Sequence, residues 1–105
     1  MVRGEIFRLS APRGRVGHEQ EGARYAIVVQ ADEMLGMSTA IIAPTSTSAR
    51  PAMFRPVIDI DGSMTRVMID HTQSVDVRRL GRSAGRLDAH ELRAIDDALT
   101  AMLGL

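Results

Sequence analysis

The chain has 105 residues, of which 45% are hydrophobic and 25% are charged, and its formal net charge is zero. This length predicts a single domain, residues 1–105, with a core just large enough to fold alone. There is no cysteine, so disulfides and thiolate metal sites are excluded, and no apolar run reaches the roughly 18 residues of a membrane span. The N-terminus lacks the apolar segment of a signal peptide, so we expect a cytoplasmic protein without membrane contact.

The basic residues are all arginine, 13 in number, and lysine is absent. A zero net charge argues against a polycation that coats nucleic acid. The arginine bias fits a GC-rich genome, but arginine is also the side chain whose planar fork binds phosphate bidentately. The cluster around Arg78 and Arg79 is accordingly either a solvated face or a phosphate-binding track.

The first half of the chain alternates strand patterns with one long polar loop. Glu5–Leu9 predicts a first strand, and residues 10–22, with three glycines and a proline, predict a loop of a length that is commonly functional. Residues 25–30 are apolar and β-branched enough for a central strand. Residues 39–43 predict a third strand that ends at Pro44, because proline cannot donate a hydrogen bond to a ladder.

The second half begins with a hairpin signal. Val57–Ile60 and residues 65–69 predict two strands around the turn pair Asp61 and Gly62, with a loop of about four residues. Residues 75–80 predict a short turn or helical piece that the following glycines end.

The last segment predicts an amphipathic helix. Asp88 is placed as its N-cap with Glu91 three residues on, a capping-box pattern, and Gly104 supplies the stop. The apolar face comprises Leu92, Ile95, Leu99, Met102 and Leu103. Five short strands and one terminal helix predict a mainly β protein, a small β-barrel with a helix packed on it.

The histidines give no metal-binding pattern. His18, His71 and His90 do not stand at a ligand spacing such as HxxxH, and no nucleophile elbow or phosphate-binding loop is present. We therefore predict that the protein uses no metal and no cofactor.

Arg24 and Thr45 form the candidate site that the strand pattern favours. Arg24 stands at the start of the central strand, and Thr45 follows the proline that we expect to end the third. If these strands are neighbours, their ends place a guanidinium near hydroxyls and could bind an oxyanion. The alternative is a strand-end arginine in a surface ion pair and a threonine that satisfies its own turn. Spacing alone leaves both possibilities open.

Five segments, in order, resemble the MazF/PemK family of toxin ribonucleases along almost the whole chain. They are residues 3–7 (RGEIF), 17–24 (GHEQEGAR), 41–46 (IIAPTS), 75–80 (VDVRRL) and the terminal helix that ends in residues 103–105 (LGL). The resemblance implies a small SH3-like barrel that forms a homodimer. It also implies the toxin of a type II toxin-antitoxin system, an endoribonuclease that cuts single-stranded mRNA at short sequence motifs without metal and is neutralised by a cognate antitoxin.

Carried over residue by residue, the resemblance assigns catalysis to Arg24 and Thr45, with Glu19 in the substrate loop. The substrate-binding candidates are His18, Gln20, Tyr25, Ser46, Thr47, Arg78 and Arg79. Tyr25 could stack a base or fill the core.

The mechanism that we expect uses the nucleophile that RNA itself carries, the 2′-OH. Arg24 would neutralise charge on the nonbridging phosphate oxygens, and Thr45 would hydrogen-bond one of them. Glu19 is the candidate base, because arginine has a pKa above about 12 and is unsuited to that role.

Two other functional classes stay open. One is a non-catalytic homologue that binds RNA or antitoxin. The other is a protein-targeting toxin of the gyrase-poison kind, a group that resembles this fold and acts through a C-terminal Trp-Gly-Ile, whereas this chain has Leu103, Gly104 and Leu105 and no tryptophan.

Overall fold

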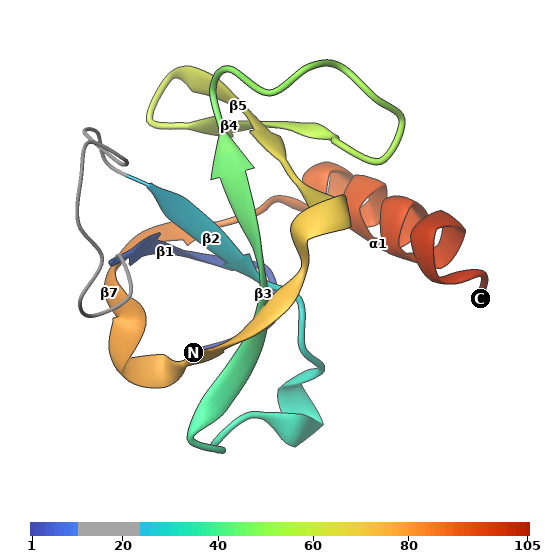
Figure 1. The fold of residues 1–105 in the computed structure, drawn as a ribbon. Helices are drawn as coiled ribbons and strands as arrows, with labels where there is room; N and C mark the ends of the chain where they lie inside the picture. The colour runs from blue at the N-terminus through green and yellow to red at the C-terminus, as the bar shows by residue number, and fades with distance from the viewer. Residues whose placement is uncertain (11–23) are drawn as a thin grey trace, which may run out of the picture.

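The computed structural model describes residues 1–10 and 24–105, which form a curled, mainly β half-barrel with a C-terminal helix, α1 (Ala89–Leu103) (Figure 1). The strands are β1 (Glu5–Leu9), β2 (Tyr25–Val28), β3 (Thr39–Ser46), β4 (Val57–Ile60), β5 (Ser63–Val67), β6 (Gln73–Asp76) and β7 (Leu80–Arg86). The described residues thus contain seven strands where the sequence predicted five, and the additional ones are β6 and β7. The predicted mainly β fold with a terminal helix is confirmed.

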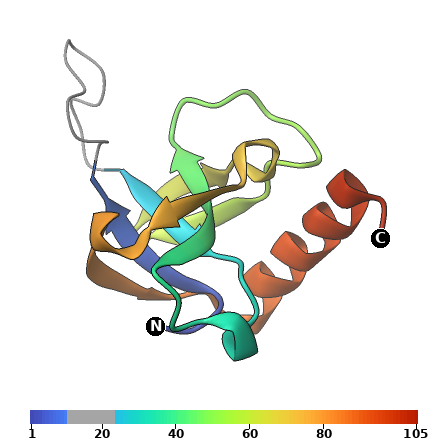
Figure 2. The same cartoon turned by 60° about the horizontal axis from the view of Figure 1, so that its bottom comes forward.

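The strand order is β4-β5-β3-β2-β1-β7, with β6 also paired to β3, and each of these pairs is antiparallel. One edge of β3 pairs with β2, and the other pairs first with β6 and then with β5. This exchange of partners lets the sheet curl, and α1 lies along one side of it in both views (Figures 1 and 2). In residues 1–10 and 24–105, no helix is long and apolar enough to cross a membrane.

Pro44 does not end the third strand, contrary to the prediction. It lies inside β3, opposite Ala26 of β2. Val29 donates to the Ile41 carbonyl, so alternation along the antiparallel ladder turns the nitrogen of Pro44 away from β2. On that other edge, the Pro44 carbonyl accepts from the Met68 N–H at 2.8 Å, and the Met68 carbonyl accepts from the His71 N–H, so the missing N–H of proline leaves no partner carbonyl without a donor.

The hairpin and the segment after it also differ from the prediction. Asp61 and Gly62 alone connect β4 to β5, both with positive φ, so the loop has two residues and not four. The turn or helical piece expected at residues 75–80 is the end of β6 followed by a 3₁₀ turn, η3 (Val77–Arg79). Gly81 and Gly85 do not end an element, because β7 continues through both beside β1.

The core consists of two clusters on opposite faces of the sheet. The first, here called the helix-side cluster, comprises Ile6, Ile27, Val29, Ala43, Ile58, Ile60, Val67, Ile69, Ile95 and Ala98. The second, on the opposite face, comprises Ala26, Val28, Ile42 and Val75. Strand β2 contributes alternately to both, as its fully apolar sequence requires.

Helix α1 begins and ends as predicted. The Asp88 carboxylate accepts from the Glu91 N–H at 2.7 Å, the Glu91 side chain accepts from the Asp88 N–H, and Gly104 adopts the left-handed conformation. The apolar face packs only in part: Ile95 is buried, but Met102 and Leu103 of the last turn are 40% and 63% exposed.

Candidate functional site

Arg24 stands at the start of β2 with a fixed backbone and an exposed side chain. Its carbonyl accepts a hydrogen bond of 3.0 Å from the Leu9 N–H, which extends the ladder between β1 and β2 by one position. The sheet therefore fixes the backbone of Arg24 while its guanidinium lies in solvent. A guanidinium held in this way can bind a large anion such as a phosphate.

Thr45 lies beside Arg24, because β2 and β3 are neighbours as predicted. Ala26 is opposite Pro44, so the next pair outward is Tyr25 with Thr45. Thr45 is only 4% exposed, and its hydroxyl donates to the Tyr25 carbonyl at 2.9 Å. The two strand ends thus lie at the same end of the sheet, but side-chain alternation directs Thr45, like Tyr25, to the helix side and Arg24 to the other face.

Ser46 and Thr47 continue β3 past this point. One further step in register puts Ser46 opposite Arg24. The Ser46 hydroxyl accepts from the Ser48 N–H at 3.1 Å in a local turn, and Thr47 is exposed. Both predicted residues therefore border Arg24, and Ser46 lies nearest in the pairing pattern.

Arg66 is a residue of this region that the sequence interpretation missed. It lies on β5 directly opposite Ser46, and its Nη1 donates to the Arg55 carbonyl at 3.2 Å. The alternation of β5, with Thr65 and Val67 buried on either side, could have indicated an outward-facing cation. Its nearness to Arg24 depends on the register with β3, which the sequence does not reveal.

Arg78 and Arg79, both predicted to bind substrate, have different surroundings. The Arg78 guanidinium binds Asp76 through two hydrogen bonds of 3.0 and 2.7 Å, which lower the pKa of that carboxyl to about 2. Its charge is therefore already paired. The Arg79 Nε donates to the Ser10 carbonyl at 2.9 Å, so this residue is at the sheet end that carries Arg24.

The remaining predicted site residues are distributed as follows. His18, Glu19 and Gln20 lie outside the described residues. Tyr25 is half-buried and packs against the helix-side cluster. Of the two roles considered for it, stacking a base or filling the core, this packing agrees with the second.

The connection between β3 and β4, residues 47–56, borders the site and is fixed to the sheet. Arg55 binds Asp70 bidentately, at 3.2 and 2.8 Å, and the guanidinium hydrogen bonds hold the pKa of the Asp70 carboxyl below its usual range. The same guanidinium lies 5.6 Å from the centroid of the Phe54 ring, and the Phe54 carbonyl accepts from the Ile69 N–H at 3.3 Å.

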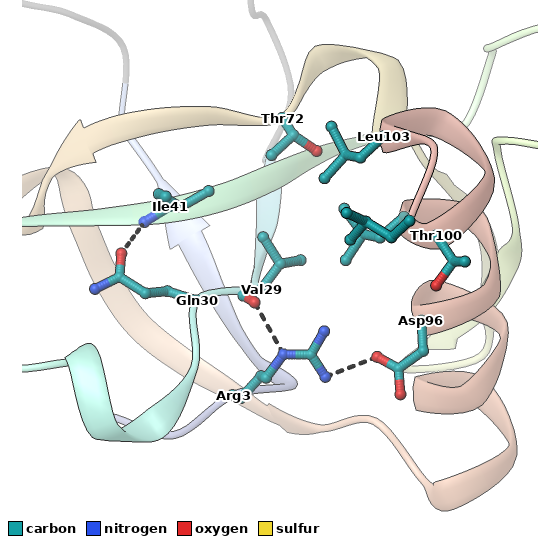
Figure 3. A pocket seen from close by; sticks show the side chains of 10 residues that line it. Arg3, Val29, Gln30, Ile41, Thr72, Asp96, Thr100 and Leu103 are labelled. Atoms are coloured by element: carbon teal, nitrogen blue, oxygen red, sulfur yellow. Dashed lines mark hydrogen bonds and ion pairs between the residues drawn. The ribbon is translucent and has the colours of Figure 1, made fainter.

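A cavity of about 350 Å³ lies at the opposite end of β2, between the sheet and α1 (Figure 3). Arg3 crosses it, donating from Nε to the Val29 carbonyl at 2.9 Å and from Nη1 to Asp96 at 2.7 Å. The other lining side chains are mostly apolar, among them Ile41 and Leu103. These two charges compensate each other, so the described residues that line the cavity offer a mostly apolar surface.

Comparison with known proteins places this geometry in a family. The family model of the PemK-like, MazF-like toxin of type II toxin-antitoxin systems matches residues 2–103. The chain belongs to this MazF/PemK toxin family. A Mycobacterium tuberculosis protein whose name calls it a candidate toxin is 34% identical over 106 residues, covering 100% of this chain and 99% of the relative.

Solved MazF/PemK structures share the fold over the same length. An endoribonuclease in complex with its cognate antitoxin, from a mycobacterial species, superposes with a TM-score of 0.81 at 19% identity, over 100% of this chain and 96% of the other. MazF from Deinococcus radiodurans gives 0.77 at 25% identity, over 100% and 97%. The resemblance inferred from sequence motifs is confirmed at the level of family and fold.

Proposed function

We propose that this protein is an endoribonuclease toxin that cuts single-stranded RNA at the Arg24 end of the sheet. The observation that carries the proposal is the exposed Arg24 on a hydrogen-bonded strand start, with Ser46 opposite it on the same face and Thr45 fixing the strand beside it. Two of the structural neighbours, both from mycobacterial species, are named endoribonucleases, which supports the same activity. Because mRNA is the proposed substrate, the site of action is the cytoplasm.

The reaction uses the 2′-OH of the substrate as nucleophile. The 2′ oxygen forms a bond to phosphorus while the bond to the 5′ oxygen breaks, leaving a 2′,3′-cyclic phosphate and a 5′-OH. The 2′ proton passes to a base, for which Glu19 stays the candidate, and the departing 5′ oxygen gains a proton. Arg24 contributes by neutralising the charge that grows on the nonbridging oxygens in the transition state.

Thr45 contributes by holding the strand end that carries Arg24. Its hydroxyl donates to the Tyr25 carbonyl, which fixes β2 to β3 one residue from Arg24. Side chains alternate along β3, so Ser46 is the hydroxyl on the same face as Arg24 and is the one placed to donate to a phosphate oxygen.

The proposed assembly is a homodimer that a cognate antitoxin inhibits. Ile41, Met102 and Leu103 are 41%, 40% and 63% exposed, and two of them line the cavity beside α1. A face that has both a hollow and protruding apolar side chains can complement a second copy of itself across a twofold axis. The antitoxin follows from the family, and several structural neighbours were solved with one bound.

The deciding experiment incubates the purified protein with a long single-stranded RNA in EDTA. We expect cutting that EDTA does not diminish and fragments that carry a 5′-OH, because Arg24 and the substrate 2′-OH supply charge and nucleophile. Cutting that stops in EDTA and returns with Mg²⁺ would refute this mechanism. Intact RNA that nevertheless binds the protein would favour the non-catalytic homologue.

The dimer has a separate test. Sedimentation at micromolar concentration should give twice the chain mass of 11.4 kDa, and Leu103→Glu should shift the protein toward monomer. A wild-type monomer that still cuts RNA would contradict the proposed assembly.

A further inference from the structure

We propose that Arg66 is a second phosphate-binding residue, which holds a backbone phosphate adjacent to the one at Arg24. The inference rests on the proposed ribonuclease function and extends the site from β2 across β3 to β5. It concerns the path of the RNA over the sheet, which the Arg24 site alone leaves undefined.

The pairing register brings the two arginines to one row. Ser46 is opposite Arg66 on one edge of β3, and the extended register puts Ser46 opposite Arg24 on the other edge. The two arginines are thus separated by two strand spacings, about 10 Å between backbones. Their long side chains can therefore contact neighbouring phosphates of one extended strand.

The alternation of side chains puts the row on one face. Tyr25 packs against the helix-side cluster and Val67 belongs to it, whereas Ala26 and Val28 belong to the cluster on the opposite face. Arg24 and Arg66 each precede a residue directed to the helix side. Both are therefore on the face directed away from the helix-side cluster, together with Ser46.

The charge of Arg66 is not compensated by the described part of the chain. Arg55 and Arg78 each bind an aspartate bidentately, but among residues 1–10 and 24–105 no ion pair includes Arg66. Its hydrogen bond from Nη1 to the Arg55 carbonyl uses one of the five guanidinium donors. Residues 1–10 and 24–105 thus leave its positive charge and the remaining donors available for a phosphate.

The bond to the Arg55 carbonyl also suggests a simpler role. Arg66 could serve only to hold residues 47–56 against β5. Charge separates the two roles, because a phosphate contact releases counterions and a loop clamp does not. The salt dependence of RNA affinity is therefore the informative measurement.

The experiment measures binding of a mixed-sequence 2′-O-methyl RNA, which has phosphates but no free 2′-OH to be cut. Affinity is titrated between 50 and 200 mM salt for the wild type, Arg66→Gln, Arg66→Lys and Arg93→Gln. Each phosphate contact to a single strand contributes about 0.7 to the slope of log affinity against log salt. Arg93, exposed on α1, is the matched control for loss of one positive charge.

We expect Arg66→Gln to lower affinity about threefold to fivefold at low salt and to reduce the slope by about 0.7. Arg66→Lys should keep the wild-type slope, since it keeps the charge, and Arg93→Gln should change neither quantity. An unchanged slope in Arg66→Gln, or equal behaviour of the glutamine and lysine variants, would overturn the inference. Wild-type protein that neither binds this probe nor cuts RNA would instead refute the proposed function.

Discussion

Replacement of Arg24 by alanine tests the catalytic proposal most directly. If the guanidinium contacts phosphate oxygens more strongly in the transition state than in the bound substrate, its loss should cost about 3–4 kcal/mol, or about 10²–10³ in rate. The fold should be unaffected, because Arg24 is exposed and its contact with Leu9 is made by the backbone carbonyl, which alanine retains.

Two companion measurements identify the chemical role. Arg24→Lys should recover only part of the rate, because an ammonium cannot make the bidentate contact with phosphate. RNA affinity should fall less than the rate in Arg24→Ala, because several phosphate contacts share the binding. A uniform loss of both would instead indicate a residue that binds substrate and transition state equally.

The assay is single-turnover cleavage of a single-stranded RNA, with a dissociation constant and a circular dichroism spectrum for each variant. Arg93→Ala, on the solvent-exposed surface of α1, controls for the loss of a positive charge. A correctly folded Arg24→Ala that cuts at nearly the wild-type rate would remove the catalytic assignment and favour a binding protein.

Three further outcomes are expected. Thr45→Val should raise the activation free energy of cleavage by about 1–3 kcal/mol, whereas Thr45→Ser, which keeps the hydroxyl, should retain most activity. Equal cleavage rates for the two variants would show that the hydroxyl has no role. Cognate antitoxin should displace labelled RNA in a competition titration, and a ternary complex would disprove a shared binding surface. The Asp76 carboxyl has a folded pKa of about 2 against an ordinary 3.8, so its stabilising effect should be complete above about pH 4 and lost as pH falls toward 2. Urea unfolding between pH 6 and 2 should show this loss, and a loss of the same size in Asp76→Asn would assign it to other groups.

Features that depend on residues close together along the chain could be predicted from the sequence. The capping box of Asp88 and Glu91 and the left-handed Gly104 fixed both ends of α1, because each interaction spans only a few residues. The bounds of β1 and β4 also agree with the prediction. Arg24 and Thr45 could be brought together because two predicted strands, adjacent along the chain, are commonly neighbours in a sheet.

Features that depend on strand partners could not be predicted in the same way. Gly81 and Gly85 favour a break by local propensity, yet pairing with β1 keeps β7 extended through both. Pro44 predicts a strand end only if its missing N–H leaves a partner carbonyl without a donor. In β3 it faces Met68, whose carbonyl accepts from the His71 N–H, so the usual penalty does not arise.

Dependence on strand partners also explains why Arg24 could be predicted as a site residue from the sequence and Arg66 could not. Arg24 is conspicuous because it follows a polar loop and precedes an apolar strand, both visible along the chain. Arg66 lies within an ordinary hairpin strand. The predicted loop between β4 and β5 was two residues too long, so the strand that carries Arg66 was expected to begin later than it does. Strand pairing converts these unrelated positions into one row across Ser46, so the extent of a phosphate-binding surface depends on register more than on local composition.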